Sequence, residues 1–399
     1  MSAGWASVVT MTDTAAELTP FRLDIPQSAL DDLHRRLADT RWPDQPAPAR
    51  PADGGWALGP PVDYLRELAE YWREKYDWRA AERQINEYPQ FTTEIDGARV
   101  HFLHVRSAEP TAMPLILTHG WPGSIVEYLD LIGPLTDPAA HGGDPADAFH
   151  VVLPSIPGYG LSGVTPETGW EAARVARAWA ELMRRLGYGR YLAHGGDWGS
   201  AITRELGLAD AEHVAALHVL QIFSAAVTPE TANLDDLEER RSVEAGKRYR
   251  AELSGYSTLQ MTRPQLISYA LTDSPIGQLA WIVDAFQHWT DSTDTPESAV
   301  DRDAMLTNVM LYWLTGTAGS SARFYYDGFR TFRQPGQVGT VPTAVAVFPR
   351  DIAVPVRRIA ERSDNIVRWT TFDRGGHFAS LEEPDLVLAD LRETFRPYR

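Results

Sequence analysis

Cysteine is absent from this chain of 399 residues. Its absence excludes disulfide bonds, thiolate metal sites and a cysteine nucleophile. The sequence also lacks an apolar run of about 18 residues, so it predicts no transmembrane helix. Residues 1–10 have no basic stretch and too little apolar character for a secretory signal peptide, and we therefore expect a cytoplasmic protein. Either Met1 or Met11 is the expected translation start.

Positive charge is scarce as well. The formal net charge is −17, and lysine occurs only at Lys75 and Lys247. We therefore expect neither nucleic acid nor an anionic membrane as a partner, because both would be repelled. The preference for arginine over lysine is typical of a GC-rich bacterial genome and indicates no function. The histidines show no metal-binding spacing, so neither a metal nor another cofactor is expected.

Apolar runs and helical patterns alternate from about residue 113 onward. Strands are predicted at 115–118, 149–153, 190–194, 214–220, 341–348 and 365–372. An amphipathic helix is predicted between 170 and 186. Short strands separated by helices predict an α/β fold with a parallel sheet.

Two other regions depart from this alternation. Residues 222–338 carry helical patterns at 264–272, 277–288 and 303–314, and they predict a helical lid inserted between two strands. Ahead of the sheet, helices are predicted over 24–42 and 61–76. The dipeptide Asp96-Gly97 then separates two strand-like runs, which is a strong signal for a β-hairpin.

The string Gly195-Gly196-Asp197-Trp198-Gly199 follows a short strand and precedes a helical pattern. Small residues around a central reactive residue are typical of a nucleophile elbow, in which a strand turns sharply into a helix. Here the central residue is an aspartate, whose carboxylate can attack an sp3 carbon and form an alkyl ester. The predicted chemistry is hydrolysis of an epoxide or a haloalkane. The alternative is an ordinary aspartate in a glycine-rich turn.

An elbow nucleophile needs an acid and a base, which follow it along the chain in that order. His377 lies in a glycine-rich segment directly after the last predicted strand. Asp351 follows the preceding strand, whereas Asp364 precedes a strand and so would lie at the wrong edge of the sheet. We therefore predict His377 as the base and Asp351 as its partner.

The oxyanion hole is expected to use two backbone N–H groups. One belongs to Trp198, the residue after the nucleophile. The other is that of Trp121, in the loop His119-Gly120-Trp121-Pro122-Gly123-Ser124 that follows strand 115–118. The same loop could be a plain turn, but its position at the carboxyl end of a strand favours a site.

These motifs together resemble the microsomal-type epoxide hydrolases of the α/β-hydrolase superfamily, from about Leu18 to Phe395. The nucleophile and oxyanion strings both match that family. Further matches lie in the N-terminal region and the lid: Pro20-Phe21, Leu33-His34-Arg35-Arg36-Leu37, Tyr71-Trp72-Arg73, Asp77-Trp78, Tyr88-Pro89-Gln90-Phe91, Gly255-Tyr256, Gln260, Asn308-Val309-Met310-Leu311-Tyr312-Trp313 and Arg323-Phe324-Tyr325.

The resemblance implies roles for two lid residues. Tyr256 and Tyr325 match the family tyrosines that bind and protonate the epoxide oxygen, whereas the nearby Tyr312 and Tyr326 do not. The relay acid is Asp351, where the mammalian enzymes have glutamate. The membrane-anchoring helix of those enzymes is missing from this chain, so no membrane association is expected. The Trp121-Pro122 peptide bond is expected to be cis, as in relatives.

The resemblance also implies an organisation and a mechanism. We expect a flexible N-terminus (1–18), an N-terminal region that wraps the lid (19–106), a split α/β-hydrolase core (107–221 and 339–399) and the lid (222–338). A small hydrophobic epoxide and water would yield a vicinal diol through an ester on Asp197. Family members lead us to expect a homodimer, and GC-rich bacterial relatives suggest a natural-product pathway of the enediyne kind. The alternatives are a haloalkane dehalogenase and a non-catalytic binding protein of the same fold.

Overall fold

The structure is a computed structural model that describes residues 18–46, 55–329 and 337–399. The expectations for Met1 and Met11 and for a flexible N-terminus fall on residues outside these ranges. Among the described residues, no helix combines the length and apolar character needed to cross a bilayer.

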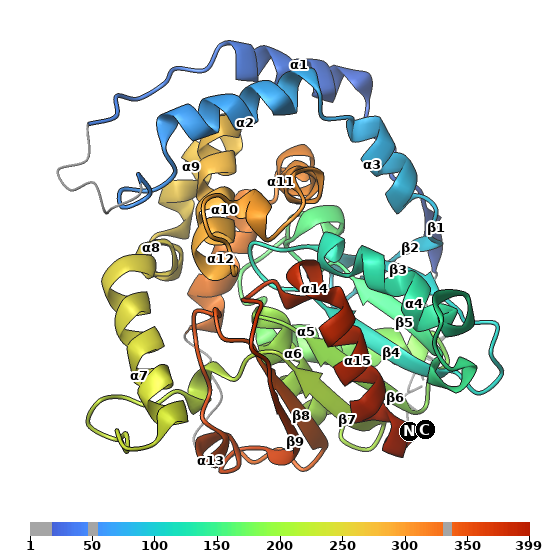
Figure 1. Ribbon diagram of the computed structural model, residues 1–399. Helices are drawn as coiled ribbons and strands as arrows, with labels where there is room; N and C mark the ends of the chain where they lie inside the picture. Colours follow the sequence, from blue (N-terminus) through green and yellow to red (C-terminus); the bar gives the residue numbers. More distant parts are fainter. Residues whose placement is uncertain (1–17, 47–54, 330–336) are drawn as a thin grey trace, which may run out of the picture.

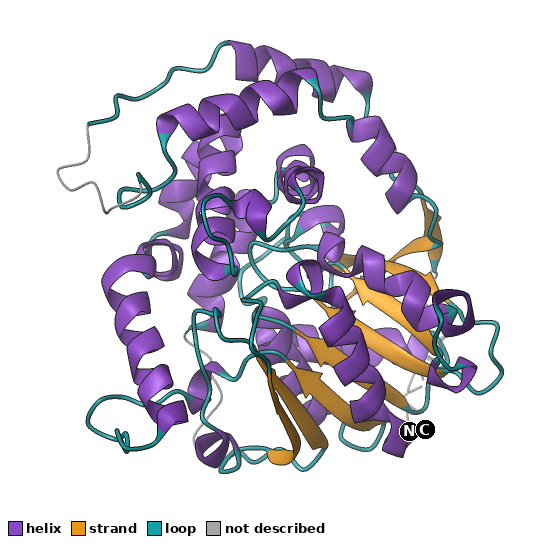
Figure 2. Ribbon diagram, viewed as in Figure 1, coloured by secondary structure: helices purple, strands orange, loops and turns teal. Residues whose placement is uncertain are grey.

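A mixed β-sheet occupies the lower right part of the molecule in the view of Figure 2. Within the described residues its nine strands run in the order β1-β2-β3-β5-β4-β6-β7-β8-β9. Their bounds are β1 Thr19–Phe21, β2 Gln90–Ile95, β3 Ala98–Val105, β4 Met113–Thr118, β5 Phe149–Pro154, β6 Tyr191–Gly195, β7 Val214–Val219, β8 Pro342–Val347 and β9 Asn365–Thr371. The neighbouring strands in the part β5-β4-β6-β7-β8-β9 of this order are all parallel, as predicted.

The predicted hairpin is formed by β2 and β3, which turn at Asp96-Gly97. It does not stand apart from the sheet. Strand β3 pairs antiparallel with β5, and β1 adds to β2, so the hairpin extends the parallel sheet at one edge. The sequence did not predict this connection, because pairing partners far apart in the chain leave no local signal.

Helices cover both faces of the sheet (Figure 1). The contacting pair α4 (Leu129–Thr136) and α15 (Pro384–Phe395) covers one face, and the contacting pair α5 (Ala172–Arg185) and α6 (Trp198–Ala209) covers the other. The side chains of β4, β5 and β6 are almost all buried between these layers, which is why the three strands read as continuous apolar runs. Short helices α13 (Arg357–Ala360) and α14 (Ala379–Glu382) flank β9 in the chain.

The lid lies between β7 and β8 in the chain and above the sheet in Figure 1. Its helices are α7 Leu237–Arg248, α8 Gly255–Thr262, α9 Pro264–Asp273, α10 Pro275–Trp289, α11 Arg302–Thr315 and α12 Ala318–Gly328. A π-helical turn, Tyr249–Leu253, joins α7 to α8. The predicted patterns correspond to α9, α10 and α11, whereas α7, α8 and α12 were not predicted. Helix α7 is largely polar, so its sequence shows little apolar periodicity.

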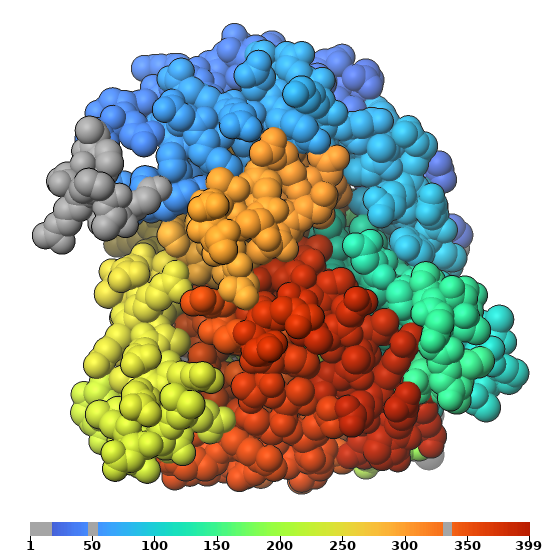
Figure 3. Space-filling model, viewed as in Figure 1, coloured from blue at the N-terminus to red at the C-terminus, as the bar shows by residue number. Residues whose placement is uncertain are grey.

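The N-terminal helices arch over the lid (Figure 3). They are α1 Gln27–Ala38, α2 Val62–Glu74 and α3 Trp78–Ile85. Helix α2 holds the lid through buried Trp72, whose indole N–H lies 3.2 Å from the Met310 sulfur, and through Tyr71, whose hydroxyl donates to Asp303 at 2.8 Å. The N-terminal region thus packs against the lid, and these contacts stabilise the position of the lid above the sheet.

The carboxyl ends of β4, β6, β7, β8 and β9 meet at one edge of the sheet, below the lid. Ligands of open α/β sheets bind at this edge, because the loops that leave parallel strands gather there. The residues of the α/β core that the sequence predicted for the site all lie in these loops or at the adjoining start of α6.

Candidate active site

Asp197 occupies a strained turn between β6 and α6. Its backbone has φ 51° and ψ −124°, a left-handed conformation that costs a non-glycine residue about 1–3 kcal/mol. The surrounding backbone is crowded: a Cβ at Gly199 would collide with the Thr118 carbonyl, and a Cβ at Gly120 would collide with the Asp197 side chain. The turn therefore aims a buried carboxylate away from the sheet and towards the lid.

His377 and Asp351 face this carboxylate from the loops after β9 and β8. The His377 Nδ1 lies 2.8 Å from Asp351 Oδ1, and its Nε2 lies 3.5 Å from Asp197 Oδ2. Burial alone would lower the pKa of His377, but the carboxylates of Asp351 and Asp197 outweigh it and raise this pKa to about 10. In the resting site the imidazole is therefore a cation held between two carboxylates.

Gln221, at the end of β7, connects the two acids. Its side-chain oxygen accepts the Asp197 N–H at 2.5 Å, and its amide donates to Asp351 Oδ2 at 2.6 Å. The Ile352 N–H donates to the other oxygen of Asp351 at 2.6 Å. Both oxygens of the Asp351 carboxylate are thereby fixed, so Asp351 presents one defined edge to His377.

The loop after β4 supplies the first expected oxyanion donor. The Trp121 N–H donates to Asp197 Oδ1 at 2.8 Å, and the Trp121-Pro122 bond is cis, as expected. Lid helix α11 holds this loop in place: Asn308 donates to the Pro122 carbonyl and Tyr312 to the Gly123 carbonyl, each at 2.7 Å. The family string in α11 thus corresponds to contacts that position the loop.

Trp198, the second expected donor, is the first residue of α6. Its N–H lies at the amino end of this helix, where partial positive charge favours an anion. Its indole packs edge-on against Phe324 and Tyr325, both with ring centroids 5.0 Å apart. The residue after the nucleophile thereby also forms part of the wall below the lid.

The two predicted tyrosines lie on the lid side of the site. Tyr256 stacks on Trp121 with ring centroids 4.9 Å apart, and Tyr325 meets both rings edge-on, 5.6 Å from Trp121 and 5.8 Å from Tyr256. The Tyr325 hydroxyl is buried and forms no hydrogen bond of normal geometry within the described residues. Burial, with nearby Asp197, raises the pKa of both phenols well above the usual value, so both remain protonated donors.

A cavity of about 480 Å3 lies beside Asp197 and these tyrosines. Asp197, Trp198, Tyr256 and Tyr325 all line it. Most of the remaining wall comes from the lid and from the loops after β7 and β8: Phe223, Ala226, Ser242, Gly246, Tyr249, Arg250, Ser254, Ser257, Thr258, Met261, Phe329, Ile352, Ala353 and Val354. The wall is largely apolar, which suits a hydrophobic ligand.

The structure brings together Asp197, His377, Asp351, Trp121 and Trp198, with Tyr256 and Tyr325 above them. The rival acid is elsewhere: Asp364 pairs with Arg204 at 2.7 Å. No group of three or more potential metal ligands is clustered among the described residues.

Sequence reasoning missed two residues of the site, Gln221 and the buried Glu127 beside the oxyanion loop. The ring of Trp289 also meets His377 edge-on at 4.9 Å. Burial raises the pKa of Glu127 to about 8. The position of Gln221 directly after a predicted strand was the one available signal.

Comparison with known proteins identifies the family of the chain. A family model described as "Epoxide hydrolase N terminus" matches residues 18–128, and one described as "alpha/beta hydrolase fold" matches residues 113–384. A Stigmatella aurantiaca protein named "Putative epoxide hydrolase" is 48% identical, with 96% of this chain and 86% of the relative covered. The chain belongs to the epoxide hydrolases of the α/β-hydrolase fold.

Other epoxide hydrolases are similar to this protein over nearly the whole chain. Epoxide hydrolase 1 of Sus scrofa is 33% identical, covering 94% of this chain and 88% of the relative. The solved epoxide hydrolase of Aspergillus niger superposes with a TM-score of 0.85 at 30% identity, covering 97% of this chain and 98% of that one. The juvenile hormone epoxide hydrolase of Bombyx mori gives a TM-score of 0.84 at 26% identity, covering 96% and 95%. The predicted fold and family are thus confirmed.

Proposed function

We propose that this protein converts a hydrophobic epoxide and water to a vicinal diol through an alkyl ester on Asp197. The observation that carries the proposal is the position of the Asp197 carboxylate. It lies between the His377–Asp351 pair and the Trp121 N–H, and it lines the same apolar cavity as Tyr256 and Tyr325.

In the first step, a carboxylate oxygen of Asp197 attacks an epoxide carbon. The C–O bond of the ring breaks, and its electron pair goes to the ring oxygen. The neutral phenols of Tyr256 and Tyr325 donate hydrogen bonds to this developing alkoxide. Because the pKa values of both phenols lie well above the usual range, both are protonated in the resting site. They can therefore donate hydrogen bonds when the alkoxide forms.

In the second step, His377 activates a water molecule that attacks the carboxyl carbon of the ester. The resting imidazole is protonated and cannot accept a proton, but ester formation removes the negative charge of Asp197. That charge is one cause of the raised pKa of His377, so this pKa falls once the ester exists. His377 can then release its proton, which the alkoxide of the first step takes up to become a hydroxyl, and act as the base. As the water attacks, His377 accepts one of its protons. The acyl C–O bond then breaks, its electron pair and the remaining water proton go to the leaving oxygen of the diol, and Asp197 becomes a carboxylate again. The N–H groups of Trp121 and Trp198 hold the oxyanion.

Haloalkane dehalogenation is the second candidate, because an elbow aspartate beside Trp198 would serve it equally. The residues of the lid favour the first reaction over the second. Halide release needs N–H donors, whereas epoxide opening needs O–H donors, and Tyr256 and Tyr325 are O–H donors in the cavity wall. A fluorogenic epoxide assay run beside a halide-release assay separates the two, and the absence of both activities would favour the non-catalytic binding protein.

The ester itself is tested with His377→Gln. This variant should accumulate an alkyl-enzyme whose intact mass rises by the mass of the epoxide, mapping to Asp197. In a single turnover of the wild-type enzyme in heavy-oxygen water, the new diol oxygen should come from Asp197, and the heavy atom should remain in the protein. Heavy oxygen in the first diol, with none in Asp197, would make Asp197 a base and refute the ester. The prediction of a natural-product substrate rests on the sequence resemblance, and a panel of such epoxides tests it.

A further inference from the structure

The end of lid helix α10 reaches the loops that carry both the relay acid and the base. Helix α10 ends at Trp289, whose carbonyl accepts the backbone N–H of His377 at 2.7 Å. A Cβ at Gly376 would collide with the backbone of Trp289 and Thr290, so the base loop and the helix end are in close contact. The lid is therefore joined to the triad by backbone as well as by its apolar wall.

Asp291, two residues beyond α10, makes a charged connection at the same place. Its Oδ1 lies 3.1 Å from Arg350 Nε, directly before Asp351, and its Oδ2 accepts the Gly375 N–H at 3.1 Å. The Arg350 N–H in turn donates to the Gly375 carbonyl at 3.2 Å. One carboxylate thereby holds the acid loop and the base loop together.

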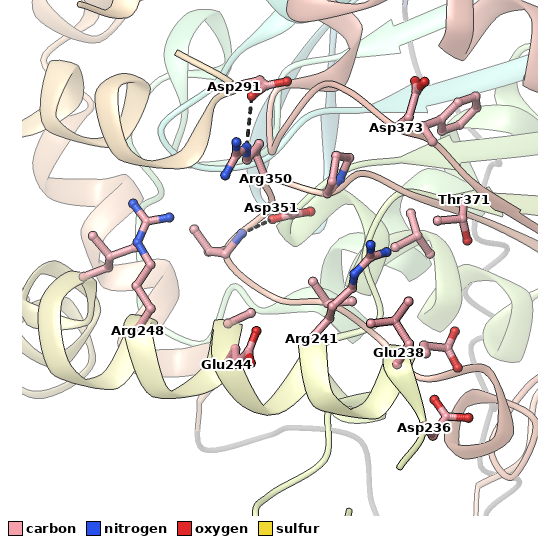
Figure 4. Close-up of a pocket in the computed structure, with 18 residues that line it drawn as sticks. Asp236, Glu238, Arg241, Glu244, Arg248, Asp291, Arg350, Asp351, Thr371 and Asp373 are labelled. Atoms are coloured by element: carbon pink, nitrogen blue, oxygen red, sulfur yellow. Dashed lines mark hydrogen bonds and ion pairs between the residues drawn. The ribbon is translucent and has the colours of Figure 1, made fainter. Parts of the chain in front are cut away.

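The surroundings place this connection outside the apolar cavity. Figure 4 shows the Asp291–Arg350 pair beside Asp351 in the wall of a charged groove of about 820 Å3, which lies between α7 and the loops after β8 and β9. Neither Asp291 nor Arg350 lines the apolar cavity. The Asp291 N–H donates to Glu382 Oε2 at 2.7 Å, which fixes the aspartate on a second side.

We propose that Asp291 is a positioning residue for ester hydrolysis, holding the loops of Asp351 and His377 at the spacing that the second step needs. The inference rests on the proposed two-step function. Because His377 touches no atom of the epoxide in the first step, loosening its loop should leave alkylation almost unchanged. In the second step the Nε2 atom of His377 must accept a proton from the water that attacks the ester carbon. A displacement of the imidazole by about 1 Å can slow such a step about 100-fold.

The kinetic signature follows from the two-step scheme. When only hydrolysis slows, kcat and KM fall together, and kcat/KM keeps the value set by binding and alkylation. We expect Asp291→Ala to lower kcat about 10- to 100-fold while kcat/KM stays within about threefold. The fraction of alkyl-enzyme at steady state, read by intact mass, should rise. Asp291→Asn keeps an acceptor for the Gly375 N–H but loses the ion pair, and it should show a smaller effect in the same direction.

Asp273→Asn is the matched control. Asp273 is the last residue of lid helix α9 and also pairs with an arginine at 3.0 Å, but its partner is Arg36 of the N-terminal region. This variant should keep wild-type kcat and ester level. The Asp291–Arg350 pair is partly exposed, and such pairs contribute little to stability, so the thermal midpoint of Asp291→Asn should remain near that of the control.

Two results would overturn the positioning role. One is an unchanged kcat in both Asp291 variants. The other is a parallel fall of kcat and kcat/KM without accumulated ester, which would place the defect in binding or alkylation. Failure of the proposed function is distinguishable from both, because in that case His377→Gln itself would trap no ester.

Discussion

Replacing Gln221 by leucine tests whether the site depends on a bridge between its two acids. The Gln221 side chain is 1% exposed, and its amide is the only described contact that joins the backbone of Asp197 to the carboxylate of Asp351. Leucine has a similar length and fills the space but offers neither a donor nor an acceptor. The substitution therefore removes these two hydrogen bonds, and a longer one from the Ser200 hydroxyl at 3.3 Å, with little change in packing.

The expected cost follows from these two bonds. Leaving the buried Asp197 N–H without an acceptor costs about 1–3 kcal/mol, and removing a hydrogen bond from the ionised Asp351 costs about 1.5–3 kcal/mol. Partial relaxation reduces the sum, so we expect the free energy of unfolding to fall by about 2–5 kcal/mol. Because Asp351 orients His377, kcat should also fall about 100-fold.

Urea unfolding and epoxide turnover measure the two effects separately. Gln278→Leu is the control, because Gln278 is equally buried but its amide donates only to the Val309 carbonyl within the lid, at 3.0 Å. It should lose about 1–3 kcal/mol of stability and keep kcat within about threefold. Equal kcat values for the two variants would refute the bridge as an element of the site.

Two further predictions concern the lid and the base. Tyr256→Phe or Tyr325→Phe alone should slow ring opening, and the double variant should lose about 10²–10⁴-fold in single-turnover alkylation; a wild-type rate in the double variant would place the donor elsewhere. The second concerns His377, whose pKa is raised from 6.5 to about 10. A raised pKa stabilises the fold fully below the unfolded value and loses this contribution as pH rises through about 10. The stability advantage of wild type over His377→Gln, measured in urea at pH 6 and pH 10, should therefore shrink, and a constant difference would contradict the protonated resting state.

The sequence predicted the part of the site that obeys a topological rule. In a parallel sheet, residues that directly follow strands meet at one edge, so Asp351 and His377 could be placed beside Asp197 from strand prediction alone. Asp364 could be rejected for the same reason, and it lies elsewhere, paired with Arg204. The helices α9, α10 and α11 were predictable because apolar residues recur in them at helical spacing.

Contacts that depend on distant partners could not be predicted. Gln221 is 130 residues from Asp351, and Asp291 is 84 residues from Gly375. Each is a polar residue in or next to a loop, where local sequence gives no sign of its partner. Helix α7 was missed for a different reason, because a helix with one weak apolar face has little periodicity to detect.

In the mechanism that we propose, the charges of the site link the two steps to one another. The imidazolium of His377 balances Asp197 and Asp351, and its Nε2 lies 3.5 Å from the Asp197 carboxylate with no lone pair that could accept a proton. Esterification would remove one carboxylate, leave the other in place, and so convert a cation beside Asp197 into a base for water. His377 would therefore become competent for hydrolysis only when there is an ester to hydrolyse. The residues that hold the loop of Asp351 matter for the same reason: after alkylation, Asp351 is the one carboxylate of the triad that still orients the imidazole.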